Sequence, residues 1–306
     1  MLTYIILGEI MQYLTLNNGV KMPILGFGVY QIPPEETKQA VLDAIDMGYR
    51  SIDTAQSYFN ERQVGEAIAE CGVPREELFI TTKVWIENYG YDKCRASVLE
   101  SLEKLGLEYI DLVLLHQPFS DYYGAYRALE DLYEEGLLRA IGVSNFYPDR
   151  LADICLFGRK IIPAINQVET NPLNAQYVAQ ANMEKNGVQI AAWAPFGEGM
   201  HGMFTNETLA RIGKKYNKSV AQVILRWLIE RSVVVLCKST HKERMAENID
   251  VFDFALDEED MLEIMKLDKS SSLFFDHADP EMVEWFDEMV EVRKNQQRAD
   301  LEQKKW

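Results

Sequence analysis

Four side chains capable of acid–base chemistry stand at or just beyond the ends of three successive apolar runs. Asp53 closes the first run and Tyr58 follows it after a turn of small residues. Lys83 closes the second run and His116 closes the third. A carboxylate, a phenol, an ammonium and an imidazole in this arrangement predict a fold that brings the ends of those runs together.

Together these groups could deliver a proton to a substrate. A lysine and an aspartate that end buried strands are expected to pair, because an unpaired buried charge is costly. A lysine beside a tyrosine hydroxyl favours the phenolate and lowers a pKa that starts near about 10. A nearby histidine can orient a substrate oxygen, so the set predicts a general acid for a developing alkoxide.

Taken singly, each residue has a plainer interpretation. Asp53 and Lys83 could form a structural ion pair, and Tyr58 could be a surface tyrosine. His116 could be a core histidine with backbone partners. The joint occurrence of all four favours a site.

Short apolar runs alternate with amphipathic stretches along the chain. The predicted strands are 24–28, 50–54, 78–83, 110–116, 138–144, 164–169, 188–195 and 233–238. The predicted helices are 34–47, 61–70, 92–105, 122–135, 149–157, 174–186, 219–230 and 241–251. The alternation predicts βαβ units and a parallel sheet. About eight units favour a closed (β/α)₈ TIM barrel, in which strand ends converge on one face and build the site.

Both ends of the chain extend beyond these units. Residues 13–23 predict a β-hairpin with a type I′ turn at Asn18-Gly19. Residues 1–10 are apolar but lack a leader pattern and are too short to cross a bilayer, so we expect either a loosely attached extra strand or an upstream start, with Met11 as an alternative start. The tail of about 270–306 has apolar residues at helical spacing over 282–290, expected to pack on the barrel, and a charged end expected to fray. We expect a single domain over 1–306.

Composition excludes several classes of partner. The 306 residues carry a net charge of −17, which argues against nucleic acid and anionic membranes. The four cysteines form no CxxC pair and predict reduced thiols in the cytoplasm. The four histidines lack metal-ligand spacing, so we expect no metal site.

The chain resembles the aldo-keto reductases, with matching motifs in order from the hairpin to about residue 280. These are LGFG (25–28), IDTAQSY (52–58), TTKVW (81–85), LLHQP (114–118), IGVSNF (141–146), NQVE (166–169), APFG (194–197) and KSTHKERMAEN (238–248). The chain looks like the compact bacterial members, such as diketogluconate and aldehyde reductases. The resemblance implies hydride transfer between a nicotinamide and a carbonyl, with Tyr58 as general acid. Lys83 would support Tyr58, Asp53 would hold Lys83, and His116 would orient the carbonyl.

The same resemblance implies NADP(H) as cofactor. Ser144, Asn145 and Gln167 would hold the nicotinamide carboxamide, whose two ends their amides and hydroxyl can match. Trp193 would stack on the ring, where the family usually has a tyrosine. The remaining cofactor residues implied are Pro195, Phe196, Gly197, Gly199, Lys238, Ser239, Thr240, Arg244, Glu247 and Asn248.

Two motifs bear on the phosphates of that cofactor. Lys238, Ser239 and Arg244 suit a phosphate monoester, so the resemblance implies that they bind the 2′-phosphate and that NADPH is preferred over NADH. Residues 197–202 spell GxGxxG, which alone suggests a Rossmann fingerprint. No strand ending in an acid follows about 20 residues later, so we favour a loop over the pyrophosphate.

The substrate pocket is expected to be lined by Tyr30, Trp85 and Phe119, with an outer wall from 200–204 and the tail near 273–277. The short segment after the seventh strand suggests an open pocket for small aldehydes, ketones or keto-sugars, in a monomer or weak dimer. One alternative is a regulatory NADPH-binding protein on the same fold, like the potassium channel β-subunits. Another is a different (β/α)₈ enzyme with a flavin or a metal.

Overall fold

A computed structural model describes residues 11–157 and 159–303, with side chains placed as far as residue 292. The chain divides into two compact units, Met1–Ser271 and Ser272–Trp306. The first unit holds the barrel and the second a long helix. The single domain expected from the sequence stays a prediction, and the strand expected over residues 1–10 lies outside the described residues.

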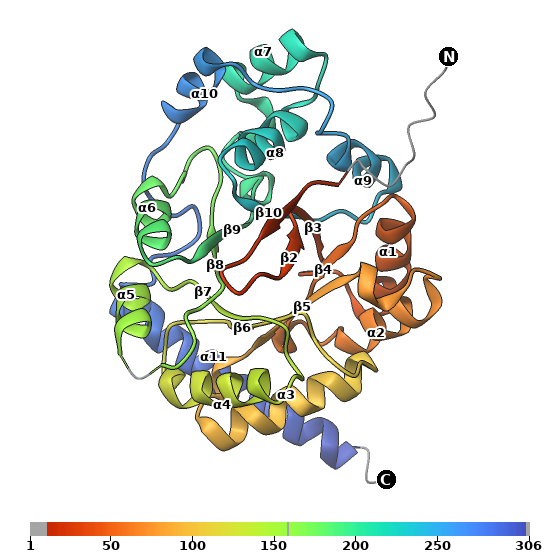
Figure 1. The fold of residues 1–306 in the computed structure, drawn as a ribbon, viewed down its shortest axis with the longest axis vertical. Coiled ribbons are helices and arrows are strands. Elements are labelled where there is room, and N and C mark those ends of the chain that lie inside the picture. Colours follow the sequence, from red (N-terminus) through yellow and green to blue (C-terminus); the bar gives the residue numbers. More distant parts are fainter. Residues whose placement is uncertain (1–10, 158, 304–306) are drawn as a thin grey trace. The chain divides into compact units, whose positions relative to one another are not determined.

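Eight parallel strands form a closed barrel, as Figure 1 shows at the centre of the ring of helices. They are β3 (Leu25–Gly28), β4 (Ser51–Asp53), β5 (Phe79–Val84), β6 (Leu112–Leu115), β7 (Ile141–Ser144), β8 (Ile165–Glu169), β9 (Gln189–Trp193) and β10 (Val234–Cys237). Neighbours in the chain are neighbours in the barrel, and β10 pairs with β3 to close it. The predicted (β/α)₈ barrel is confirmed.

Helices follow the strands. They are α1 (Pro34–Asp46), α2 (Glu61–Glu70), α3 (Tyr91–Leu105), α4 (Tyr122–Glu134), α5 (Pro148–Leu156), α6 (Tyr177–Lys185), α7 (Glu207–Tyr216), α8 (Val220–Glu230), α9 (Lys242–Ile249) and α10 (Glu258–Met265). The sequence predicted all of these but α7 and α10. Both missed helices begin at a side-chain cap, Asn206 accepting from Leu209 N and Asp257 accepting from Asp260 N. Such a residue before an acidic first turn is a helix-start signal that the prediction passed over.

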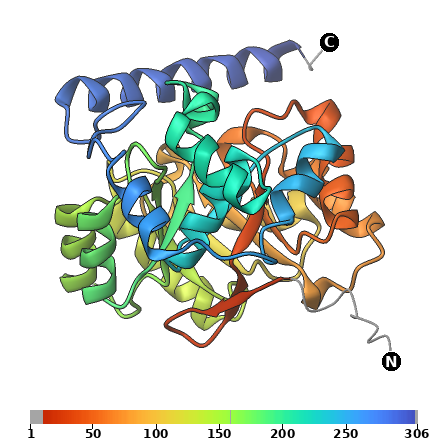
Figure 2. The same ribbon diagram turned by 90° about the horizontal axis from the view of Figure 1, so that it is seen from above.

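A hairpin closes the end of the barrel where the strands begin (Figure 2). It consists of β1 (Tyr13–Thr15) and β2 (Lys21–Pro23), paired antiparallel. Leu16 and Met22 of the hairpin are buried in one apolar cluster with Phe79 and Leu112, the first residues of β5 and β6. The opposite end, where the strands finish, is therefore the one available for a site.

The predicted type I′ turn of the hairpin is wrong. Gly19 N donates to Leu16 O at 2.9 Å, so the central residues of the turn are Asn17 and Asn18. Neither has a positive φ, and only Gly19 does, at 85°. The asparagines serve as anchors instead, because Asn17 Nδ2 donates to the carbonyl of Pro163 and Asn18 Nδ2 to that of Arg139. A glycine after such a turn supplies the left-handed residue that lets the strands pair.

The second unit contains α11 (Pro280–Gln303) and the segment before it. The rings of Phe275, His277 and Phe286 pack against one another, with centroid distances of 4.8 Å from Phe275 to His277, 5.7 Å from Phe275 to Phe286 and 6.3 Å from His277 to Phe286. Trp285 packs edge-on against Phe286. Packing of this helix on the barrel, and fraying of its charged end, stay predictions. Over the described part of the chain, no helix is both long and apolar enough to cross a membrane.

Candidate active site

The structure brings Asp53, Tyr58, Lys83 and His116 together where β4, β5 and β6 end. Lys83 Nζ donates to the Asp53 carboxylate and to Thr54 O, and it lies 3.4 Å from Tyr58 Oη. The rings of Tyr58 and His116 meet edge to face, with centroids 5.7 Å apart. A phenol, an ammonium and an imidazole therefore share one small volume at the mouth of the barrel.

Tyr58 reaches this place on a three-residue 3₁₀ turn, Gln56–Tyr58, that is separated from the end of β4 by two residues. Phe59 leaves the turn in the left-handed region, at φ 58°. Asn60 then fixes the chain, because its Oδ1 accepts from Thr54 Oγ1 at 2.8 Å and its Nδ2 donates to Val29 O at 3.1 Å. Buried side-chain bonds rather than a regular element thus hold the tyrosine in place.

The electrostatics of the pair correct one expectation. Burial lowers the pKa of Lys83, and the adjacent Asp53 carboxylate partly opposes that change. Burial raises the pKa of Tyr58 well above its ordinary value, and Asp53 and Tyr30 act in the same direction. The pKa of Tyr58 therefore lies above its ordinary value and not below it as expected, and burial is the largest cause. A phenol that keeps its proton at neutral pH suits a general acid.

Gln167 on β8 connects Ser144 of β7 to the Asp53–Lys83 pair. Its Nε2 donates to the second oxygen of Asp53 at 2.9 Å. Its backbone carbonyl accepts from Ser144 Oγ of β7 at 2.8 Å. Asp53 is thus shared between the lysine on one side and an amide on the other.

Asn145 and Trp193 continue this network. Asn145 Nδ2 donates to His116 O at 3.0 Å and to Ser144 Oγ at 3.2 Å. Its Oδ1 accepts from the indole N–H of Trp193 at 2.9 Å. This bond fixes the indole plane beside the polar groups, and an amide that binds here competes with some of these contacts. The backbone of Asn145 stands at φ 65°, a strained conformation of the kind found at sites.

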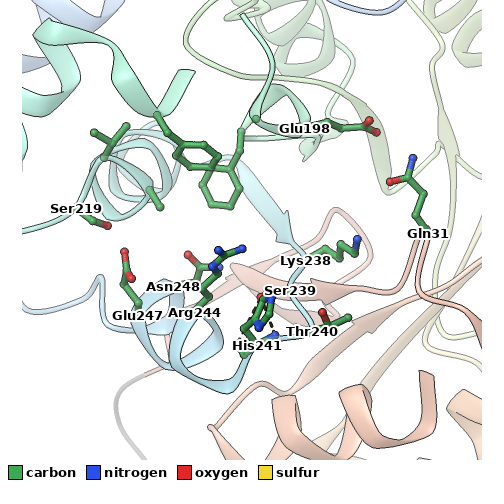
Figure 3. Close-up of a pocket in the computed structure, with 15 residues that line it drawn as sticks. Gln31, Glu198, Ser219, Lys238, Ser239, Thr240, His241, Arg244, Glu247 and Asn248 are labelled. Carbon is green, nitrogen blue, oxygen red and sulfur yellow. Dashed lines mark hydrogen bonds between the residues drawn. The ribbon is translucent and has the colours of Figure 1, made fainter. Parts of the chain in front are cut away.

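A cavity of about 800 Å³ lies at the start of α9 (Figure 3). The residues expected at a cofactor site that line it are Phe196, Gly199, Lys238, Ser239, Thr240, Arg244, Glu247 and Asn248. Figure 3 shows Arg244 and Asn248 pointing into it from α9. In a chain of net charge −17, Lys238 and Arg244 place two cationic side chains at this cavity, beside Glu198 and Glu247. Pro195 and Gly197 stand next to lining residues but not among them.

The fold and these motifs agree with comparison to known proteins. Residues 24–269 match the family model described as the Aldo/keto reductase family. The chain belongs to this family. It is 48% identical over 256 residues to the glyoxal reductase of Bacillus subtilis (strain 168), covering 83% of this chain and 92% of that protein.

Solved aldo-keto reductases share its shape. An aldo-keto reductase from a Medee basin deep-sea metagenome library, MGS-M4, superposes with a TM-score of 0.83 at 42% identity, covering 87% of this chain and 98% of that one. The Bombyx mori aldo-keto reductase in complex with NADP gives 0.82 at 38% identity, covering 86% and 95%. The expectation of a compact bacterial-type aldo-keto reductase is confirmed.

In this aldo-keto reductase, aromatic side chains pack beside Tyr58 and His116. Tyr30 lies 4.9 Å from Tyr58 between ring centroids, and Trp85 lies 5.1 Å from His116. Phe119 is half-buried in the segment after β6. From the expected outer wall, Phe204 lines the cavity by α9, where its ring meets that of Phe196 at 5.5 Å. Residues 273–277 belong to the second unit, so their place in the wall stays a prediction.

Several cavity residues were not predicted, although the sequence held a signal for three of them. Gln31, Glu198 and His241 line the cavity. Glu198 stands inside the GxGxxG motif and His241 inside the KSTHKER motif, both of which were singled out. Ser219 also lines it and caps α8, accepting from Gln222 N at 3.2 Å. The S-x-x-Q spacing marks a helix start, and helix starts favour anions.

Proposed function

We propose that this aldo-keto reductase is an NADPH-dependent oxidoreductase that reduces small aldehydes, ketones or keto-sugars to alcohols. The observation that carries the proposal is the contact of Tyr58 with Lys83, itself paired with Asp53, at the mouth of the barrel. That arrangement and the similarity to a glyoxal reductase support oxidoreduction at a CH–OH group, with NADP as acceptor, as the reaction class of this proposal.

The residues at the cavity by α9 fit the adenosine end of NADP(H). Lys238 and the Arg244 guanidinium can make charge-assisted bonds to a phosphate monoester, and the Ser239 hydroxyl adds a donor. Glu247 and Asn248 offer polar groups to an adenine. NADPH is therefore the preferred cofactor in this proposal, in keeping with the NADP complex of the Bombyx mori relative.

The hydrogen-bond network at the ends of β7, β8 and β9 fits the nicotinamide end of the cofactor. Ser144, Asn145 and Gln167 present hydroxyl and amide groups that can exchange their present bonds, to one another and to Asp53, for bonds to a carboxamide. Trp193 offers an indole face held by Asn145. When bound, the cofactor supplies the hydride, and the protein supplies orientation and the proton.

The proton comes from Tyr58 Oη. Its raised pKa keeps it protonated until a carbonyl oxygen gains negative charge. Lys83, 3.4 Å away, stabilises the phenolate that forms, and Asp53 holds Lys83 in position. His116, edge-on to the phenol, orients the carbonyl oxygen. Positioned proton transfer of this kind accelerates reactions by about 10²–10⁴-fold.

We further propose a cytoplasmic location and a monomer or weak dimer. All four cysteines are free thiols and three of them are buried, which suits a reducing compartment. A small-molecule carbonyl is the partner of the proposed reaction.

The test is a panel of glyoxal, methylglyoxal, simple ketones and keto-sugars, each assayed with NADPH and with NADH in parallel. Steady oxidation of NADPH, faster than that of NADH, is the expected outcome. Tight cofactor binding without turnover of any carbonyl would contradict an enzyme and support a regulatory NADPH-binding protein on this fold.

A further inference from the structure

Gln56 opens the turn that carries Tyr58, and its side chain makes four hydrogen bonds. Nε2 donates to Ser97 O and to Ser101 Oγ of α3, both at 3.2 Å. Oε1 accepts from Trp85 N at 3.1 Å and from Asn88 Nδ2 at 2.9 Å. A primary amide offers two donors and two acceptor lone pairs, so the full capacity of Gln56 is used.

These bonds join three separate segments. The turn Gln56–Tyr58 carries the acid, the segment from Trp85 to Asn88 carries the aromatic wall, and α3 lies behind both. Trp85 in turn meets the His116 ring at 5.1 Å. The side chain of Gln56 is half-buried, so water competes only partly for its partners.

The turn itself has little regular structure to fix it. Tyr58 N donates to Ala55 O at 3.0 Å, and Phe59 N reaches Gln56 O only at 3.4 Å. The Tyr58 hydroxyl lies 3.4 Å from Lys83 Nζ, a long contact that a small shift would break. Asn60 anchors the far end of the turn toward Val29. Gln56 anchors its near end toward the aromatic wall.

We propose that Gln56 is a positioning residue for the reduction, setting the Tyr58 hydroxyl against Lys83 and against the Trp85 wall. The inference rests on the proposed function. Displacement of a reacting group by about 1 Å can cost about 10²-fold in rate, so loss of the four bonds lowers kcat. The cavity by α9 has no lining residue in this turn, so cofactor affinity is unchanged.

The test compares Gln56→Met with the parent. Methionine keeps the length and volume of the side chain and removes all four bonds. The control is Gln39→Met on the exposed face of α1, where Gln39 Nε2 donates to the Asp43 carboxylate at 2.7 Å. A second variant, Asn88→Ala, removes one of the four bonds and so perturbs folding less.

Four quantities are measured for each protein: kcat and KM with methylglyoxal and NADPH, the Kd for NADPH, and the thermal midpoint. For Gln56→Met we expect kcat to fall at least about 10-fold with the Kd for NADPH within about twofold. Asn88→Ala should give a smaller fall in kcat, and Gln39→Met none. A merely structural role would lower the midpoint but leave kcat per cofactor-binding site at the parent value.

The outcomes separate the two claims. If Gln56→Met keeps the kcat of the parent while Tyr58→Phe abolishes turnover, the positioning role of Gln56 is overturned and the proposed function stands. A parent protein that turns over no carbonyl overturns both. If Gln56→Met does not fold, Asn88→Ala decides: an unchanged kcat overturns the role, and a lowered kcat at unchanged Kd supports it.

Discussion

Gln167 Nε2 donates a 2.9 Å hydrogen bond to the same Asp53 carboxylate that binds Lys83. All three side chains are buried, so each satisfies a charge or polar group that water cannot reach. Asp53 therefore links Gln167 of β8, which would hold a nicotinamide carboxamide, with Lys83, which supports Tyr58. Its role is to hold two neighbours, whereas that of Tyr58 is to transfer the proton.

Asp53→Asn should test that division of roles. The substitution leaves Lys83 buried without its counter-charge, so we expect a loss of about 3–5 kcal/mol in unfolding free energy. Turnover per folded molecule should fall less than in Tyr58→Phe, because the phenol is still present. Urea unfolding and kcat measure the two effects, and Asp149→Asn, an exposed side chain 3.9 Å from Arg150, is the control. A larger loss of turnover in Asp53→Asn than in Tyr58→Phe would reverse the assigned roles.

Arg244→Ala should change cofactor selectivity. Loss of a charge-assisted bond to the 2′-phosphate costs about 1.5–3 kcal/mol, or roughly 10–100-fold in the Kd for NADPH. The Kd for NADH, which lacks that phosphate, should change little. Fluorescence titration with both cofactors measures this, with Arg211→Ala, whose guanidinium pairs with Glu263 of α10, as the control. An equal increase in the Kd for NADPH and the Kd for NADH would show that Arg244 does not recognise the 2′-phosphate.

The order of strands and helices along the chain, and the residues at which the strands end, could be predicted from the sequence. Short β-branched runs alternating with amphipathic stretches fix a parallel barrel, and the barrel then brings Asp53, Lys83 and His116 to one face. The positions of α7 and α10 were missed because their caps, Asn206 and Asp257, were not read as helix starts.

Quantities set by tertiary surroundings were out of reach. The Tyr58 pKa was predicted in the wrong direction because burial, its largest cause, has no local sequence pattern. The hairpin turn was predicted wrongly because Asn17 and Asn18 bond to carbonyls of Pro163 and Arg139, more than a hundred residues away. Local turn preference yields to such long-range partners.

Gly142→Ala should destabilise the barrel. A Cβ at Gly142 on β7 would lie 2.6 Å from the backbone carbonyl of Ile165, which cannot move without shifting β8. We expect a loss of about 1–3 kcal/mol in unfolding free energy. At Gly28 the nearest atom is Cys237 O at 3.9 Å, so Gly28→Ala serves as the matched control in urea unfolding. Equal stability of the two variants would contradict the close approach of β7 and β8.

The second unit should respond to acid through His277. Burial lowers the pKa of His277 to about 4. An unfolded histidine takes up its proton near pH 6.5, so stability is intact above that value and is lost as pH falls toward about 4. An NMR titration of the His277 ring protons should give a midpoint near 4, and His277→Phe should remove part of the acid sensitivity of the unit. A midpoint near 6.5 would mean that the ring is solvated.

Replacement of Tyr58 by phenylalanine tests the central claim most directly. Tyr58→Phe removes one hydroxyl and keeps the ring that packs against Tyr30 and His116. With methylglyoxal and NADPH we expect kcat to fall by about 10²–10⁴-fold, with the Kd for NADPH unchanged. Reduction of the aldehyde at the parent rate would show that the proton comes from another group.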